Sequence, residues 1–138
     1  MSFELYVQSF KDGEPAGIPL GVIRTAFGGF LSEQERDYWH ITYGPSDSCE
    51  LALSALPNSL AQVHCITIAR PCSNPRFWSS LIELLSIGNT VLYFPGCSGP
   101  MVLNAGAAAH LPPDMLASLG KPIVVSSGAD MLARVRAA

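Results

Sequence analysis

The sequence predicts a single α+β domain spanning residues 1–138, in which a mainly antiparallel sheet of five to seven strands has helices packed on one face. Three observations support this prediction. Short stretches that alternate between polar and apolar residues dominate the first half of the chain, two other stretches carry apolar residues at helical spacing, and 49% of the 138 residues are hydrophobic. A chain of this length and hydrophobic content can bury one core of ordinary size without disulfides or metals.

The first half of the chain contains the strongest strand patterns. We expect, in order, a strand at 3–10, a helix at 19–28 and strands at 38–43, 49–56 and 62–70. In the first strand Phe3, Leu5 and Val7 alternate with polar residues, which is typical of a strand with one buried face. Pro19 suits the first turn of the helix, and Gly28 ends it. Because short turns connect the last three strands, we expect an antiparallel meander with one solvated face.

The second half alternates between helices and short strands. We expect a helix at 74–87, strands at 91–94 and 101–104, a short helix at 112–120, a strand at 122–127 and a helix at 128–138. Asn74 caps the first of these helices, and Gly88 stands where a left-handed residue ends it. The strand VLYF is apolar on both faces, which predicts a central position in the sheet. Ser127 and Asp130 resemble a capping box at the start of the last helix.

The charge distribution excludes one class of partner. Residues 1–50 contain eight acidic and three basic residues, whereas the remainder contains three acidic and five basic ones, for a net charge of −3. No cluster of lysine or arginine exists beyond Arg134 and Arg136. The release of counterions that drives nucleic-acid binding therefore has little to act on, and we expect no nucleic-acid partner.

One long stretch carries no charge. No Asp, Glu, Lys or Arg occurs from Leu84 to Pro113, so this stretch is either buried or an apolar contact surface, and self-association through 84–113 is a possible use. It is not expected to cross a membrane because Pro95, Gly96 and Pro100 interrupt it. The N-terminus has neither the basic nor the apolar region of a signal peptide, so we expect a cytoplasmic protein without a membrane partner.

The four cysteines are expected to be free thiols. Their spacings of 16, 7 and 25 residues match no disulfide scaffold and include no C-x-x-C pair. Cys97 lies in GCSG, which resembles the G-x-S-x-G nucleophile elbow, but Pro100 stands where the final glycine belongs. We therefore interpret GCSG as a tight turn in which Gly96 and Gly99 supply positive φ angles. The alternative is a small enzyme or small-ligand binder that uses Cys97 with a histidine base such as His110.

No metal or cofactor is expected. The three histidines have no short spacing between them, and the dinucleotide-binding and phosphate-loop glycine patterns are absent. His64 alternates with its neighbours on a strand, so we expect it to share a face with Ile66 and Ile68 as a core or interface residue.

The solvated face of the sheet is the leading candidate site. If the alternation holds, this face carries Glu4, Tyr6, Gln8, Tyr38, His40 and Thr42, together with Glu50 and Ser54. Tyrosine buries a large rigid area at low entropy cost, and acidic residues attract a basic partner. The composition therefore indicates a non-enzymatic protein-binding surface, with an ordinary solvated face as the alternative.

Three segments resemble a known family. FELYVQSFKDGEPAGIP, VLYFPG and HLPPDMLASLGKP are similar to segments of small bacterial proteins that open with a strand of the DLYLQ kind followed by F-x-x-G-E-P. Some members of that family look like immunity proteins of polymorphic toxin systems. The resemblance covers both ends of the chain and carries no catalytic motif. It implies a cytosolic bacterial protein that neutralises a toxin by binding it. The acidic, tyrosine-bearing face predicts that such a toxin is basic.

Overall fold

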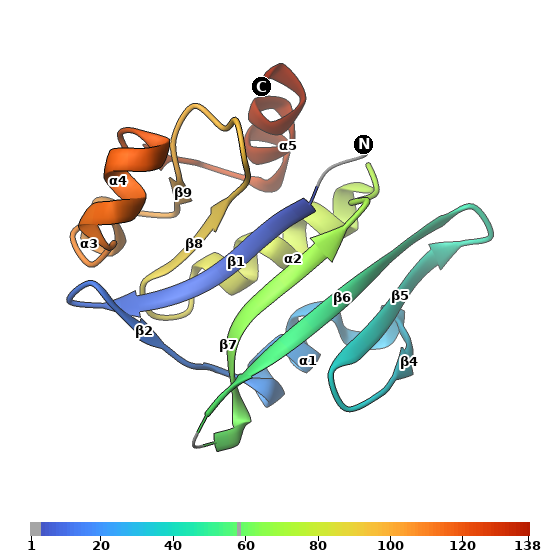
Figure 1. Ribbon diagram of the computed structural model, residues 1–138. Coiled ribbons are helices and arrows are strands. Elements are labelled where there is room, and N and C mark those ends of the chain that lie inside the picture. The colour runs from blue at the N-terminus through green and yellow to red at the C-terminus, as the bar shows by residue number, and fades with distance from the viewer. Residues whose placement is uncertain (1–3, 58) are drawn as a thin grey trace.

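The computed structural model describes residues 4–57 and 59–138, so the predicted start of the first strand at Phe3 lies outside the described residues. In this part of the chain ten strands form one mixed sheet in the order β10–β9–β8–β1–β7–β6–β5–β4, with β2 beside β1 and β3 beside β7 (Figure 1). The strands are β1 (Glu4–Lys11), β2 (Glu14–Ala16), β3 (Ile18–Pro19), β4 (Leu31–Gln34), β5 (Tyr38–Gly44), β6 (Asp47–Leu56), β7 (Ser59–Ala69), β8 (Thr90–Tyr93), β9 (Met101–Val102) and β10 (Ile123–Val124).

The α+β class and the mainly antiparallel sheet are confirmed. Every described pair of strands is antiparallel except β9 with β10, and β5, β6 and β7 form the predicted meander. The described sheet has ten strands rather than five to seven. The three strands that we did not expect, β2, β3 and β4, are two to four residues long, which is too short to show a period of two.

Five α-helices accompany the sheet in the described residues. They are α1 (Leu20–Phe27), α2 (Pro75–Leu85), α3 (Ala105–Ala108), α4 (Pro113–Leu119) and α5 (Gly128–Ala137), and a 3-10 turn, η1 (Gly28–Phe30), follows α1. The two helices predicted at 19–28 and 74–87 pack side by side on the same face of the sheet, where the rings of Phe27 and Phe77 stack with centroids 6.1 Å apart. The short α3 was not expected, because AGAA has no helical pattern of its own.

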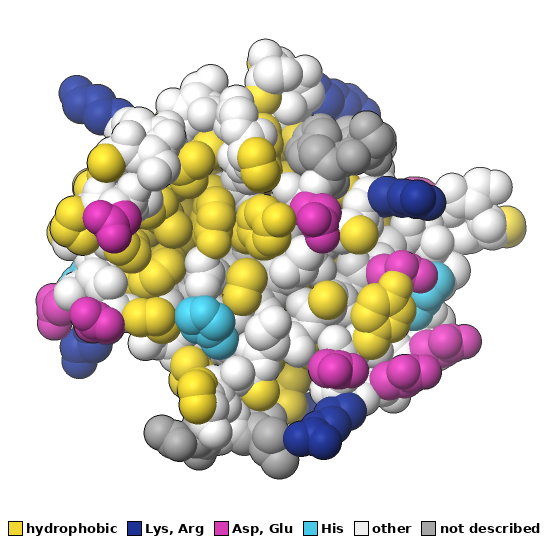
Figure 2. Space-filling view, in the orientation of Figure 1, with side chains coloured by type: hydrophobic (Ala, Val, Ile, Leu, Met, Phe, Trp, Pro, Cys, Tyr) yellow, Lys and Arg dark blue, Asp and Glu magenta, His cyan; other side chains and the backbone are white. Residues whose placement is uncertain are grey.

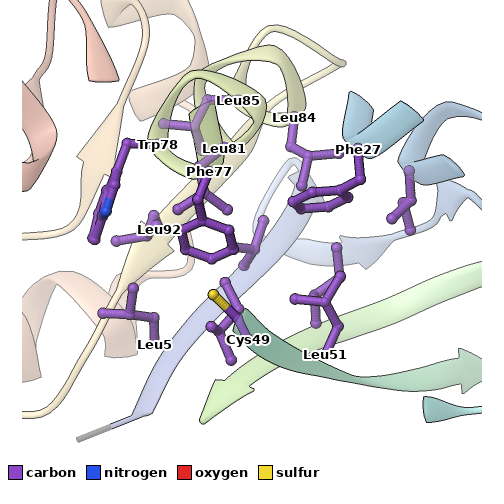
Figure 3. Packing of buried hydrophobic residues seen from close by; sticks show 14 of the residues in the cluster. Leu5, Phe27, Cys49, Leu51, Phe77, Trp78, Leu81, Leu84, Leu85 and Leu92 are labelled. Carbon is purple, nitrogen blue, oxygen red and sulfur yellow. The ribbon is translucent and has the colours of Figure 1, made fainter. Parts of the chain in front are cut away.

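The main core lies between the sheet and the layer formed by α1, α2 and α5 (Figure 1). Figure 3 shows the side chains of Phe77 and Leu81 pointing from α2 toward Leu5, Cys49 and Leu92 on the strands. Each large apolar side chain that is fully buried here stabilises the fold by about 1.5–3 kcal/mol. As predicted, α2 begins at a cap: the Asn74 Oδ1 atom accepts a hydrogen bond of 2.9 Å from the backbone N–H of Arg76.

A smaller core lies on the opposite face, at one end of the sheet. Its buried members come from β1, β8, β9, α3 and the segment before α4, namely Phe10, Val91, Val102, Ala107 and Leu111. The short helices α3 and α4 therefore cover β8 and β9 on the side that faces away from α2 (Figure 1). No helix of the described residues covers the rest of that face, over β1, β7, β6 and β5 (Figure 1).

The uncharged stretch 84–113 supplies both cores. Its large apolar residues are mostly buried within the chain, which explains the absence of charge. They are Leu84, Leu85, Val91, Leu92, Phe94, Met101, Val102 and Leu111. Among the described residues, no helix combines the length and the apolar character needed to cross a membrane.

Candidate functional site

One broad face of the sheet is left largely uncovered, and we call it the open face. Figures 1 and 2 are viewed from this side, with β1 in front of α2. The pairing of the strands assigns side chains of five strands to it: Glu4, Tyr6 and Gln8 of β1, Tyr93 of β8, Cys65 and Thr67 of β7, Glu50, Ala52 and Ser54 of β6, and Tyr38, His40 and Thr42 of β5. All eight residues that the alternation predicted to share a face therefore do so.

Two tyrosine positions flank a strip of small side chains on the open face. Cross-strand partners follow one another from β8 to β5 in the row Tyr93, Tyr6, Thr67, Ala52, Tyr38. Neighbouring strands lie about 4.8 Å apart, so the backbones at Tyr6 and Tyr38, three strands apart, are separated by about 14 Å. Thr67 and Ala52 do not fill the space above the sheet as tyrosines do. The row therefore has two aromatic contact points, with a lower surface of small side chains between them.

Glu50 organises the β5 side of the open face. Its Oε2 atom accepts a hydrogen bond from the Tyr38 hydroxyl, and its Oε1 atom lies 3.7 Å from Nδ1 of His40. The hydrogen bond to Glu50 raises the pKa of the Tyr38 phenol above its usual value. Tyr38 nevertheless remains 41% exposed, which is unusual among the large hydrophobic side chains of this chain. A rigid, solvent-facing aromatic ring thus stands beside a carboxylate.

The β1 side of the open face is a more buried network. The rings of Tyr6 and Tyr93 stack with centroids 5.4 Å apart, and the Tyr93 hydroxyl donates a hydrogen bond to Oε1 of Gln8. Burial raises the pKa of Tyr93 to about 12. Gln8 is only 9% exposed, and its amide nitrogen lies 3.4 Å from Nε2 of His64. Gln8, predicted as a binding residue, is hydrogen-bonded to Tyr93 and presents little of its side chain to solvent.

A shallow apolar hollow adjoins this network. It has a volume of about 430 Å³ and is lined by Tyr6, Tyr93 and Pro95 together with Asp114, Met115, Ser118 and Leu119 from α4. Figure 2 shows hydrophobic side chains gathered over β8, β1 and α4, and acidic side chains on the side of β4 and β5. The open face thus runs from an apolar end to an acidic end.

His64 also reaches the open face, which corrects the prediction from the sequence. Its Nε2 atom lies 3.4 Å from Nε2 of Gln8, whereas Ile66 and Ile68 are buried in the main core on the other face. The cause is a β-bulge: Ser54 pairs with Cys65 and the next residue of β6 pairs with Val63, so His64 is an extra residue in β7. Regular alternation does not hold across a bulge, and the residues QVHC contain no sequence signal that predicts one.

The structure does not bring Cys97 and His110 together. Cys97 lines a hollow of about 150 Å³ with residues such as Phe94 and Met101, and no histidine is among the described residues of that lining. His110 instead accepts a hydrogen bond of 3.0 Å from the backbone N–H of Asp12, where it ties the α3–α4 connection to the turn after β1. His110 thus has a structural partner of its own.

The GCSG segment is a turn with two different glycine requirements. Gly96 has a φ angle of +84°, as predicted. Gly99 was also predicted to have a positive φ angle, but this prediction is wrong. Glycine is needed at this position for a different reason, because a Cβ atom would lie 2.0 Å from the carbonyl oxygen of Lys121. Pro100 then leads into β9 rather than into a helix, so the helix that a nucleophile elbow requires does not follow Cys97.

Within residues 4–57 and 59–138, no group of three or more His, Cys, Asp or Glu side chains is arranged to hold a metal ion. Comparison with known proteins found no matching family model, no matching curated protein and no matching solved structure. The chemistry of the open face is therefore the basis for a functional proposal.

Proposed function

We propose that the protein is a non-enzymatic binding domain whose open face holds a basic protein partner, in the manner of an immunity protein that neutralises a basic toxin. The observation that carries the proposal is the pair formed by Tyr38 and Glu50, an exposed tyrosine hydrogen-bonded to a carboxylate on an uncovered sheet. Tyrosine is enriched among the residues that dominate binding energy at protein interfaces.

The strand register supports an extended contact. Tyr38 at one side and Tyr6 at the other are fixed on a rigid sheet, so neither loses much conformational freedom on binding. The apolar hollow beside Tyr6 adds area that can be removed from water. Together these features resemble an interface with aromatic anchors and a polar rim.

The charges around Tyr38 favour a basic partner. Glu50 lies on the open face, and Glu33, Glu35 and Asp37 are exposed along β4 and the turn into β5, with Arg36 as the accompanying base. Such a field speeds the approach of a positively charged protein and disfavours an acidic one. A second copy of this chain would bring the same acidic residues against the face, so self-association there is disfavoured.

The class of partner is inferred from chemistry together with the resemblance of the chain's end segments to immunity proteins. Toxins that attack nucleic acids carry basic surfaces because their substrate is polyanionic. An acidic, tyrosine-bearing face is complementary to such a surface and would block it.

The proposal is tested by capture from lysate of the source cells and by co-expression with the product of the adjacent gene. We expect a specific complex with a protein that is positively charged at neutral pH. Tyr38→Ala and Glu4→Ala should weaken the complex without unfolding the protein. Glu83→Ala is the matched control for Glu4→Ala, because Glu83 is an exposed glutamate on α2, on the other side of the sheet.

Three results would contradict the proposal: retention of no partner, retention of an acidic partner only, or equal loss of binding for Glu83→Ala and the open-face variants. Loss of binding on substitution of Cys97 with the open-face variants unaffected would instead move the site to the GCSG turn.

A further inference from the structure

Two cysteines that are distant in sequence meet at the junction of β6 and α2. Cys49 lies near the start of β6, Cys72 lies in the segment that leads into α2, and their Sγ atoms are 3.0 Å apart. All four cysteines are free thiols in the structure. We infer that Cys49 and Cys72 form a redox-active dithiol that small-molecule disulfides oxidise to an intrachain disulfide. This inference does not depend on the proposed binding function.

The surroundings hold the two sulfur atoms in place. The Trp78 Nε1–H donates to the Cys72 carbonyl oxygen at 2.8 Å, and the Cys72 backbone N–H donates to the Cys49 Sγ atom at 3.4 Å. Close by, the Asn74 side-chain amide donates to Oδ2 of Asp47 at 2.8 Å, which fastens the start of α2 to the start of β6. A disulfide has an S–S distance of about 2.05 Å, so the sulfurs need to approach by only about 1 Å.

The hydrogen bonds also distinguish the two thiols. The Cys49 S–H donates to the Cys72 sulfur, and this bond, together with a bond to the Asn74 backbone, lowers the pKa of Cys72. The same contact with Cys72, together with burial, raises the pKa of Cys49. Burial and, to a smaller extent, the carboxylate of Asp47 oppose the ionisation of Cys72, but each is a smaller influence than the Cys49 hydrogen bond. Cys72 is also more exposed than Cys49, so we assign Cys72 as the attacking thiolate and Cys49 as the resolving thiol.

The two thiols differ in their exposure to solvent. Cys72 is half-buried and is the more accessible of the two, whereas Cys49 is only 3% exposed. A compact disulfide such as hydroxyethyl disulfide therefore meets Cys72 first. Cys65 and Cys97 lie on other parts of the fold, Cys65 on the open face and Cys97 in the GCSG turn, and serve as internal references.

The reaction is a pair of thiol–disulfide exchanges. The Cys72 thiolate attacks one sulfur of the small disulfide, whose S–S bond breaks, so that one small thiolate leaves and Cys72 carries a mixed disulfide. Cys49 then gives up its proton to solvent and attacks the Cys72 sulfur, which expels the second small thiolate. The two cysteines lose two electrons and two protons, and the small disulfide gains both to become two thiols.

The test exposes the folded full-length protein to hydroxyethyl disulfide, blocks the remaining thiols by alkylation and analyses the protein by intact mass and unreduced peptide mapping. We expect a mass lower by two hydrogen atoms before alkylation, a single cross-link between the peptides that contain Cys49 and Cys72, and two alkylated thiols at Cys65 and Cys97. Cys72 should react about tenfold faster than Cys65 or Cys97.

Variants separate the two roles. Cys49→Ser should stop the reaction at the mixed disulfide on Cys72, whereas Cys72→Ser should remove the fast reaction altogether. A double variant, Cys65→Ser with Cys97→Ser, should still form the cross-link. If a serine variant does not fold, as judged by circular dichroism, Cys49→Ala and Cys72→Ala replace the pair. Persistence of both thiols, mixed disulfides that never resolve in the wild type, or a cross-link to another cysteine would overturn the inference.

Discussion

Tyr93 shows how a single residue of the open face contributes to stability. Its hydroxyl donates to Gln8, its ring stacks on Tyr6, and burial raises its pKa to about 12. Because the protonated phenol is the form that the fold favours, its contribution is fully present below the unfolded pKa of about 10. The contribution is lost as the pH rises through about 12.

We predict that Tyr93→Phe lowers the free energy of unfolding near neutral pH by about 1–3 kcal/mol, because the buried Gln8 oxygen loses its donor. The variant should also lose less stability than the wild type between pH 10 and pH 12, since no phenol remains at this position to ionise. Urea unfolding at several alkaline pH values measures both effects. An unchanged neutral stability, or the same alkaline slope in both proteins, would contradict this assignment.

Residues of the open face were predictable from sequence where a strand is regular. Glu4, Tyr38 and His40 lie where the alternation placed them, because a period of two fixes the face along an unbroken strand. The position of His64 was not predictable, because the bulge arises from how β7 pairs with β6, a long-range choice. The burial of Gln8 was missed for a similar reason, since its partners Tyr93 and His64 are distant in sequence.

At the scale of elements, α2 is joined to the sheet through the residue that caps it. Asn74 accepts from the Arg76 N–H through Oδ1 and donates to Asp47 through its amide nitrogen. The same side chain therefore begins the helix and anchors it to β6. A carboxylate could perform the first task but not the second.

We predict that Asn74→Asp destabilises the protein by about 1–2 kcal/mol although aspartate is as good a cap as asparagine, because two carboxylates would face each other. Adding Asp47→Asn should restore most of the stability, since the new amide can donate to the new carboxylate. The double-mutant cycle is measured by urea unfolding at neutral pH. If the loss of stability in the double variant equals the sum of the losses in the two single variants, the contact between Asn74 and Asp47 contributes nothing.

The dithiol at the same junction gives a second prediction for these elements. Oxidation of Cys49 and Cys72 closes a loop that runs through β6 and β7, and the loss of chain entropy in the unfolded state should raise the free energy of unfolding by about 3 kcal/mol. Urea unfolding of the oxidised and reduced forms measures the difference. A decrease on oxidation would mean that the disulfide strains the native junction.

The sequence allowed the longer elements to be predicted, and the reasons are local. α2 has a cap, a proline in its first turn and an apolar stripe, and β5, β6 and β7 are each at least seven residues long, so that they contain stretches of regular alternation. Elements of two to four residues, such as β3 and α3, are stabilised by contacts with neighbouring segments. Their own residues therefore show no periodic pattern that predicts them. The meeting of Cys49 and Cys72 likewise depends on tertiary packing, and the cysteine spacings gave no indication of it.

At the scale of the whole molecule, the unequal sizes of the two cores explain why part of one sheet face is left uncovered. The larger core seals one face of the sheet with α1, α2 and α5, and the smaller one seals only the end at β8 and β9 (Figure 1). The remaining face is therefore a rigid platform, apolar near α4 and acidic near β5 (Figure 2). Among the described helices after β8, α5 packs against α2 on the covered face, whereas α3 and α4 lie over β8 and β9 on the other face.

The most direct test of a binding role for the open face is the affinity of the purified captured partner for the wild type and three variants, measured by calorimetry at low and high salt. Tyr38→Ala should weaken binding at least about tenfold. Glu50→Ala should weaken it mainly at low salt, because its charge is screened at high salt. Glu83→Ala should bind as the wild type does. Equal affinity of the wild type and Tyr38→Ala, or equal weakening by Glu83→Ala and Glu50→Ala, would contradict a binding site on this face.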